Sequence, residues 1–263
     1  MTQPAIADLL RPLSARSLIA SALLGSHPPA LPGRLLVAMG ERFGISGGTT
    51  RVALSRMVDR GELANDNGTY ALAGELLERQ ERQDSRRAGP LPDWDRSWEQ
   101  AVVTTSGRSA TDRGRLRRAL TGLGMGELRE GVWMRPANLA PGRLPSARSV
   151  ADEQVHWYGI APLDESKAAG LAARLFDLDG WASTAAVLDA AIGHASRELE
   201  TDDDAVVSGF NLASATLRHL THDPQLPPEL TPPSWPADAL RRSYAEFESA
   251  YQQLLRTFFR SIS

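Results

Sequence analysis

The chain has 263 residues, an apolar fraction of 42% and a formal net charge of −3 at pH 7. This length suits two or three domains, and the apolar fraction is ample for packed cores. The absence of cysteine excludes disulfides and thiolate metal ligands, and it fits the reducing cytoplasm, where we expect the protein to act. No apolar run approaches the ~20 residues of a membrane span, and no export signal opens the chain. We therefore expect no membrane partner.

The charge is distributed unevenly along the sequence. Residues 1–73 carry seven arginines against five carboxylates, whereas residues 164–263 carry eight basic and fifteen acidic side chains. An N-terminal part that can approach phosphates, followed by an acidic remainder, is a sensible division for a regulator. A surplus of two positive charges carries little weight without a motif.

The stretch Gly44–Leu72 predicts the recognition helix and wing of a winged helix-turn-helix. The segment 46–49 can supply an N-cap. Gly61 stands where the helix must end, and Asn67-Gly68 between two short strand-like runs is a strong hairpin signal. Residues at the spacing of one buried helix face are Thr50, Ala53, Leu54 and Met57.

The opposite face of this helix is the candidate DNA-binding surface. It carries Thr49, Arg51, Val52, Ser55 and Arg56. Arginine and serine can contact base edges or phosphate oxygens, and valine can meet a thymine methyl group. The alternative is a solvated face on a helical domain with another role. The wing turn, residues 65–69, has an acid and no base that could pair with a DNA backbone.

Two further helices are predicted before the recognition helix. The apolar run Leu18–Leu24 follows a serine-rich start and ends at Gly25. Pro32 suits the first turn of the second helix, whose apolar face ends at Phe43. The order helix, helix, recognition helix, hairpin is that of a winged helix, which we expect within residues 1–80.

The middle of the chain predicts a small α+β domain at residues 94–177. Mixed charge after the wing predicts a solvated helix, followed by a linker at residues 81–93. Trp94 and Trp98 are predicted to pack as an anchor rather than to stack on bases. A loose segment is predicted at 136–149, before the last strand. The predicted elements are the strand Ala101–Thr105, the helix Ser109–Leu123, strands within Leu128–Pro136, the strand Val155–Ile160 and the helix Glu165–Phe176.

Residues 178–263 are predicted to form a helical domain, so the expected fold is α+β and mainly helical. The expected helices are Trp181–Ile192, Phe210–Leu220 and Ala237–Phe259. The prolines of residues 223–236 disfavour helix, while Leu226, Leu230 and Trp235 can fix this segment to a core. A polyproline ligand is the alternative.

Several of these segments resemble the PaaX family of bacterial transcriptional regulators, which are repressors typified by control of phenylacetate degradation. The resemblance extends from about Leu13 to Phe259. It is carried by Arg16–Ile19, Phe43–Ile45, Thr50–Gly61, Gly131–Pro136 and the proline-rich segment. It implies that the middle domain is ferredoxin-like. It also implies a homodimer that binds a double-stranded DNA operator, represses a catabolic operon and is released by an acyl- or aryl-coenzyme A thioester.

The expected effector would be bound by arginine and tryptophan side chains in the middle of the chain. A coenzyme A phosphate would favour arginine, and an aryl group would favour an aromatic wall. The candidates are Arg108, Arg113, Arg117, Arg118, Trp133 and Trp157, with Trp181 as a further aromatic side chain. For each one the alternative is a surface arginine or a core tryptophan.

Two other function classes were weighed against the regulator. The middle domain is similar to CRISPR-associated ferredoxin-like nucleases, which place an acidic metal ligand at the end of the first strand. In this chain residues 104–106 at that place are Thr-Thr-Ser, which supply no carboxylate, and the nearest one, Asp112, lies beyond the loop. His219 and His222 have no predicted third metal ligand. We therefore expect no enzyme, metal site or cofactor. The third class is a protein-interaction module without DNA binding.

Overall fold

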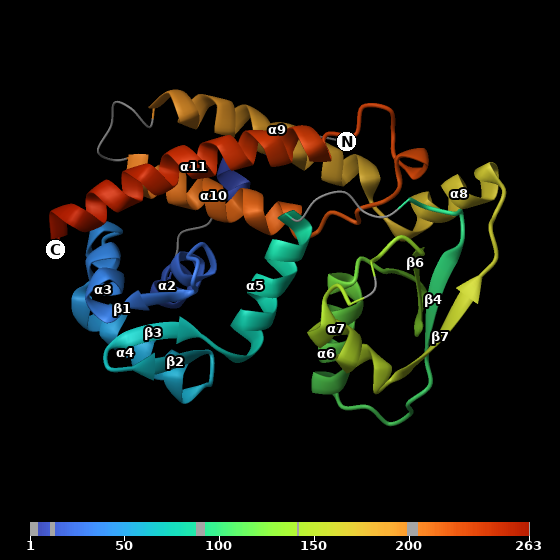
Figure 1. Cartoon of the computed structure of the whole chain (residues 1–263), viewed down its shortest axis with the longest axis horizontal. Helices are drawn as coiled ribbons and strands as arrows, with labels where there is room; N and C mark the ends of the chain where they lie inside the picture. Colours follow the sequence, from blue (N-terminus) through green and yellow to red (C-terminus); the bar gives the residue numbers. More distant parts are fainter. Residues whose placement is uncertain (1–4, 11–13, 88–92, 141, 199–204, 263) are drawn as a thin grey trace. The chain divides into compact units, whose positions relative to one another are not determined.

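The computed structural model describes residues 5–10, 14–87, 93–140, 142–198 and 205–262 (Figure 1). Helices and two small antiparallel sheets make the fold α+β and mainly helical, as predicted. The described parts form two compact units, one from Arg82–Thr184 with His219–Asp238, the other from Thr2–Glu81, Ala185–Arg218 and Ala239–Ser263. The chain passes between them inside the helices α5 (Gly74–Arg87), α9 (Leu178–Glu198), α10 (Ala205–Leu220) and α11 (Ala237–Ile262).

The predicted linker at 81–93 overlaps the end of α5, and its residues 88–92 lie outside the described residues.

The N-terminal part is a winged helix, preceded by the short helix α1 (Ile6–Leu9). Its sheet has the strand order β1-β3-β2. The strand β1, whose three residues include a proline, was not predicted, because so short a run has no usable periodicity. The elements in chain order are α2 (Ala15–Leu24), β1 (Ala30–Pro32), α3 (Gly33–Arg42), α4 (Gly47–Asp59), β2 (Leu63–Asp66) and β3 (Thr69–Leu72).

The helices α3 and α4 cross closely at Gly40. A Cβ atom there would collide with the Oγ1 atom of Thr50. Thr50 has no exposed surface, and its hydroxyl donates to the Ser46 carbonyl at 3.2 Å. Gly44, with a φ of +73°, makes the turn between the two helices. The turn and the crossing together set the direction of α4.

The winged helix and the C-terminal helices share one compact unit. Phe43, just after α3, packs edge-on against Phe210 of α10, with ring centroids 5.2 Å apart. Gly209 lies against the ring of Tyr251 on α11, where a Cβ atom would be 2.8 Å from two ring carbons. Arg218 of α10 donates to the Leu9 carbonyl at 2.9 Å. The three predicted C-terminal helices are therefore present, and α10 contacts the winged helix through an aromatic pair.

The other unit, Arg82–Thr184 with His219–Asp238, contains a four-stranded antiparallel sheet with the order β5-β6-β4-β7. The alternation of strands and helices is the βαββαβ pattern of a ferredoxin-like domain. Helices α6 and α7 lie side by side (Figure 1), and their apolar side chains join Ala101, Trp133 and Val155 of the sheet in one core. The elements are β4 (Trp98–Val103), α6 (Ala110–Gly122), β5 (Gly126–Arg129), β6 (Val132–Pro136), α7 (Pro145–Asp152) and β7 (Val155–Ile160), followed by α8 (Glu165–Leu175).

The prediction of a loose segment at 136–149 is wrong at its end, where α7 begins. Pro145 occupies the first turn, and Leu144 before it adopts a left-handed conformation with a φ of +60°. The buried residues Ala147, Val150 and Ala151 have helical spacing, which the surrounding arginines, serines and prolines concealed. The second helix of the ferredoxin-like pattern is therefore α7, and the predicted helix at 165–176 is the additional α8.

Residues 223–236, here called the proline strap, pack onto the same unit. Leu226 and Leu230 join a core cluster with Trp98, which has no exposed surface. Trp94 packs edge-on against Trp98 at 6.0 Å, so the predicted tryptophan anchor is confirmed. Trp235 stacks on Trp181 of α9 at 4.7 Å. One turn of 3-10 helix, Pro228–Leu230, interrupts the strap.

A buried arginine ties the strap to the sheet. Arg135 of β6 is 1% exposed. Its guanidinium donates to the carbonyls of Leu123 and Pro136 and to Asn138 Oδ1, the last at 2.8 Å. The Asn138 side chain in turn donates to the Gln225 carbonyl at 3.5 Å. Such a charge is tolerated inside a protein only where hydrogen bonds replace its hydration.

Replacing Gly40 with alanine should destabilise the protein, although alanine favours helix. The new Cβ would meet a buried, β-branched side chain that cannot move aside, and overpacking of this kind costs about 1–3 kcal/mol. Thermal unfolding of Gly40→Ala measures the loss. The matched control is Gly193→Ala on α9, where nothing lies within 4 Å and alanine should stabilise by about 0.5–1 kcal/mol. Equal shifts in the two variants would contradict the close crossing.

His219 should make stability depend on pH. Burial lowers its pKa from 6.5 to about 4, and its ring stacks on Trp181 at 4.5 Å. The unfolded chain binds the proton more tightly, so the contribution is complete above pH 6.5 and is lost as the pH falls towards 4. The loss is at most about 3 kcal/mol. Urea unfolding at several pH values should show this slope, and His219→Phe should flatten it.

The matched control is His156→Phe, because His156 is exposed on β7. An unchanged slope in His219→Phe would assign the pH dependence to other groups.

Candidate nucleic-acid interface

The start of α4 is fixed by a side-chain cap. The Ser46 hydroxyl oxygen accepts a hydrogen bond from the Thr49 backbone N–H at 3.2 Å, and the two hydroxyls lie 2.9 Å apart. Thr50, Leu54 and Met57 are at most 2% exposed, so they face the core. This confirms the cap and these three residues of the predicted buried face; the fourth, Ala53, is only partly buried. With one side of α4 buried, the opposite side must face solvent.

The structure brings the five predicted DNA-binding residues together on that exposed side. They are Thr49, Arg51, Val52, Ser55 and Arg56, and every one is exposed. Val52 is 51% exposed, which is high for a large apolar side chain. Arg51 and Arg56 form no hydrogen bond or ion pair with any residue that the structure describes. Their charges are therefore available to a partner.

A groove runs between the start of α2 and one flank of α4, and we name it the α2–α4 groove. Its volume is about 610 Å³. It is lined by Ser14, Ala15, Arg16, Gly48, Thr49, Val52, Ala53, Arg56, Met57 and Arg60. Arg51 and Ser55 are not among its lining residues. The exposed side of α4 is thus divided between a groove flank and an open flank.

Two arginines of this groove are absent from the residues predicted to bind DNA. Arg60 follows Arg56 by four residues, a helical spacing that could have identified it. Arg16 has no local signal, because α2 reaches the flank of α4 only through the fold. Its Nε and Nη2 atoms donate to the Glu62 carboxylate at 2.8 and 2.9 Å. This hydrogen bonding raises the pKa of Arg16 and fixes the direction of its side chain.

The wing is a tight hairpin, as predicted. Asn67 and Gly68 have φ values of +47° and +84°, which suit a two-residue turn between twisted strands. Asn65 Oδ1 accepts a hydrogen bond from the Gly68 N–H at 3.1 Å, and Asn67 donates to Asp66 at 3.0 Å. The exposed tip therefore presents a carboxylate and amides, and the hairpin contains no basic residue.

The α6 arginines predicted to bind an effector lie at a different surface. Arg113 and Arg117 line a shallow groove of about 560 Å³ together with carboxylates. Arg117 pairs with Glu127 at 2.8 Å, and Arg113 donates to the Arg108 carbonyl at 2.7 Å. Arg118 is exposed on the same helix. The arginines are thus near one another but mostly engaged.

The tryptophans proposed for the effector are not grouped with one another. Trp133 is 5% exposed within the sheet core, although the Arg117 guanidinium lies 5.4 Å from the ring centre. Trp181 is buried between His219 and Trp235. Trp157 is partly exposed on β7, which leaves it as the accessible aromatic side chain of the three.

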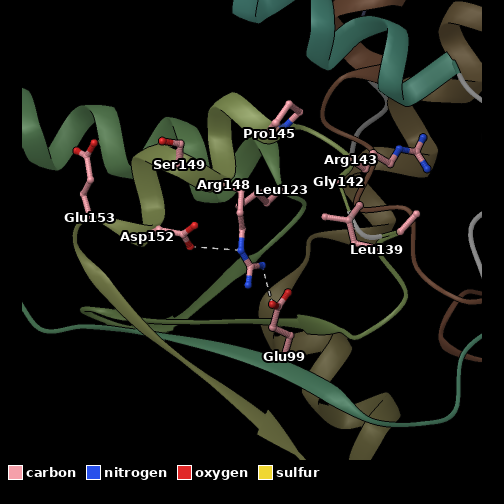
Figure 2. A pocket seen from close by; sticks show the side chains of 11 residues that line it. Glu99, Leu123, Leu139, Gly142, Arg143, Pro145, Arg148, Ser149, Asp152 and Glu153 are labelled. Atoms are coloured by element: carbon pink, nitrogen blue, oxygen red, sulfur yellow. Dashed lines mark hydrogen bonds and ion pairs between the residues drawn. The ribbon is translucent and has the colours of Figure 1, made fainter.

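Arg148, whose guanidinium lies over the Trp157 ring, lines a pocket of about 790 Å³ beside α7, which we name the α7 pocket (Figure 2). The Arg148 guanidinium lies 3.5 Å from the centre of the Trp157 ring and bonds to Glu99 at 2.7 Å and to Asp152 at 3.4 Å. The Trp157 N–H donates to Asp152 at 2.7 Å. The pocket is lined by Glu99, Leu123, Leu139, Ala140, Gly142, Arg143, Pro145, Arg148, Ser149, Asp152 and Glu153.

The residues weighed for metal chemistry have other contacts. Asp112 caps the start of α6 together with Ser109, and these hydrogen bonds lower the pKa of its carboxyl. His219 Nε2 lies 3.1 Å from the Trp181 carbonyl. Across the described ranges, no group of three or more histidine, aspartate or glutamate side chains could hold a metal ion. None of the described helices has the length and hydropathy that crossing a bilayer demands.

Three models of one family match successive parts of the chain. They are PaaX-like protein at residues 14–76, PaaX protein central Cas2-like domain at residues 91–165 and PaaX-like protein C-terminal domain at residues 180–261. The chain is also similar to the solved structure of the uncharacterized protein Rv0674 from Mycobacterium tuberculosis. The two are 37% identical with a TM-score of 0.62, over 93% of this chain and 98% of that one. Among curated proteins none matches. The chain therefore belongs to the PaaX-like family of transcriptional regulators.

Proposed function

We propose that this regulator represses a catabolic operon by binding its operator DNA as a homodimer in the cytoplasm. The observation that supports this best is the exposed side of α4, where Arg51 and Arg56 have no partner among the described residues. An α-helix fits the major groove, and uncompensated arginines gain most from contact with phosphates or guanine.

The proposed dimer places two copies of α4 in successive major grooves. Half-sites of such an operator are about 34 Å apart, or one helical turn of DNA. Arg51 is a candidate for bidentate contact with guanine, and Val52 for contact with a thymine methyl group. The acidic wing tip contributes little to binding in this arrangement, because a carboxylate is repelled by phosphates.

The proposed effector is an acyl- or aryl-coenzyme A thioester, and the α7 pocket is its candidate site. The volume of about 790 Å³ is within the range of small-molecule sites. Leu123, Leu139 and Pro145 offer an apolar wall to an acyl or aryl group. Arg143 and Arg148 line the same pocket, and Arg148 would have to exchange its bonds to Glu99 and Asp152 for a phosphate. The effector would release the operator by binding one dimer geometry more tightly than the other.

A metal-dependent nuclease is the alternative function, and the Cas2-like description of the central domain favours it. The residues after β4 oppose it, because Thr104, Thr105 and Ser106 supply no carboxylate to a cation. Incubation of labelled DNA and RNA with Mg²⁺, with and without a chelator, separates the two. Chelator-sensitive cleavage would replace the regulator proposal with this one.

The double variant Arg51→Ala, Arg56→Ala should bind the operator at least tenfold more weakly. Two arginine contacts of about 1–3 kcal/mol each would be lost from one helix per protomer. The measurement is a gel-shift titration on the promoter region of the protein's own gene.

The matched control is Arg115→Ala, Arg174→Ala, which removes the same charge from exposed positions on α6 and α8. If the two double variants bind the operator equally well, α4 is not the reading helix, and a protein-interaction module without DNA binding becomes the better account.

A coenzyme A thioester of the correct acyl group should weaken the gel shift by about 5- to 150-fold, the usual range of coupling between two sites. Ser149→Trp places an indole at the rim of the α7 pocket and should abolish this response while leaving effector-free DNA binding intact. Ser166→Trp, at an exposed position on α8, is the control. If no thioester in a panel changes the shift, the effector proposal fails and the DNA-binding proposal stands.

A further inference from the structure

The lining of the α2–α4 groove has an unbalanced charge. Three of its side chains are arginines, Arg16, Arg56 and Arg60, and none is a carboxylate. Arg16 is paired with Glu62, whereas Arg56 and Arg60 are not paired within the described residues, so an anion that enters the groove gains charge-assisted hydrogen bonds.

Arg16 is held at the edge of this groove. Its Nε and Nη2 atoms bond to Glu62, and within the described residues no bond engages Nη1. The side chain is 49% exposed, whereas that of Glu62 is 17% exposed. A guanidinium fixed in this way loses little conformational entropy when it binds a second acceptor. Ser14 and Thr49 also line the groove, with hydroxyls that hydrogen-bond to those of Ser17 and Ser46.

Gly48 leaves the groove open beside the first turn of α4. A Cβ at Gly47 would lie 2.7 Å from a Glu41 carboxylate oxygen, so an alanine there would displace the end of the exposed Glu41 side chain. A Cβ at Gly48 would meet only Ser46 Oγ, at 3.9 Å, so packing does not require the second glycine. Glycine disfavours helix, and a position that retains it without a packing reason suits close approach of a ligand to the backbone.

Arg51 and Ser55 are also exposed on α4, but they do not line the groove. A helix that lies in the major groove has the phosphate backbones along its flanks. We infer that the α2–α4 groove seats a backbone phosphate of the operator, held by Arg16 and Arg56 beside Gly48. This inference rests on the proposed DNA-binding function.

The phosphate seat assigns different tasks to residues of one helix. Arg56, with Arg16 from α2, contacts the backbone whatever the sequence, and Arg51 with Ser55 reads the bases. A phosphate bound in the groove also provides the contact with the DNA backbone that the acidic wing does not supply. Phosphate contacts set the register of a protein on the duplex and carry no sequence information themselves.

The first test compares operator DNA with an unrelated duplex over a range of salt concentrations. Arg16→Ala and Arg56→Ala should each weaken binding to both duplexes by the same factor, about five- to tenfold near 0.1 M salt, and each should reduce the salt slope by about one. Arg51→Ala should weaken operator binding far more than unrelated binding. If Arg16→Ala and Arg56→Ala lower only the operator affinity, or lower neither, the phosphate seat is wrong.

The second test uses Gly48→Ala, which has space for its methyl group. The variant should unfold at the same or a higher Tm, because alanine favours helix, yet bind both duplexes at least threefold more weakly, because the methyl group obstructs the phosphate. Gly193→Ala should raise Tm similarly and leave both affinities unchanged. Unchanged DNA binding by Gly48→Ala would overturn the proposed seat.

The outcomes separate the two proposals. Equal affinity of the wild-type protein for operator and unrelated DNA, with uniform losses in the groove variants, would leave the seat and remove sequence-specific regulation. Operator preference without any effect of the groove variants would leave regulation and remove the seat. No binding to any duplex would remove both.

Discussion

The crossing of α3 and α4 at Gly40 and Thr50 is the constraint on which the candidate interface depends. Thr50 fills the space that a side chain at position 40 would occupy, and its hydroxyl closes onto the Ser46 carbonyl. With this contact and the cap fixed, α4 cannot rotate about its axis without burying charge. A rotation by one residue, about 100°, would carry Arg51 to the buried position that Thr50 occupies. The position of every exposed residue of α4 therefore follows from one small residue pair.

Because α4 is held in one orientation, the directions of the charged side chains around it are fixed as well. Free guanidinium groups on a mobile loop would reach many acceptors, whereas those of Arg51 and Arg56 project from a helix whose orientation is set by its core. Arg16 achieves the same result differently, because Glu62 holds it from a second element. The whole chain is slightly acidic, so the attraction for DNA is a local property of this surface and not of the protein as a whole.

Much of the N-terminal fold could be predicted from local patterns. The spacing of Thr50, Leu54 and Met57 identifies the buried side of α4, and Asn67-Gly68 identifies the wing. What sequence could not supply depends on distant segments: β1 exists only because it pairs with β3, and Arg16 joins the groove only because α2 packs on α4. The proposed effector residues were harder still, since a buried tryptophan such as Trp133 and a partly exposed tryptophan such as Trp157 look the same in a sequence.

The passage of the chain between its two units inside helices has a consequence for biosynthesis. The unit that contains α4 also contains most of α10 and α11, so parts of it follow the four-stranded sheet of the other unit in the chain. A ribosome that has finished the winged helix has not yet made Phe210, the aromatic partner of Phe43. A nascent chain that ends before α10 therefore leaves Phe43 without this aromatic partner.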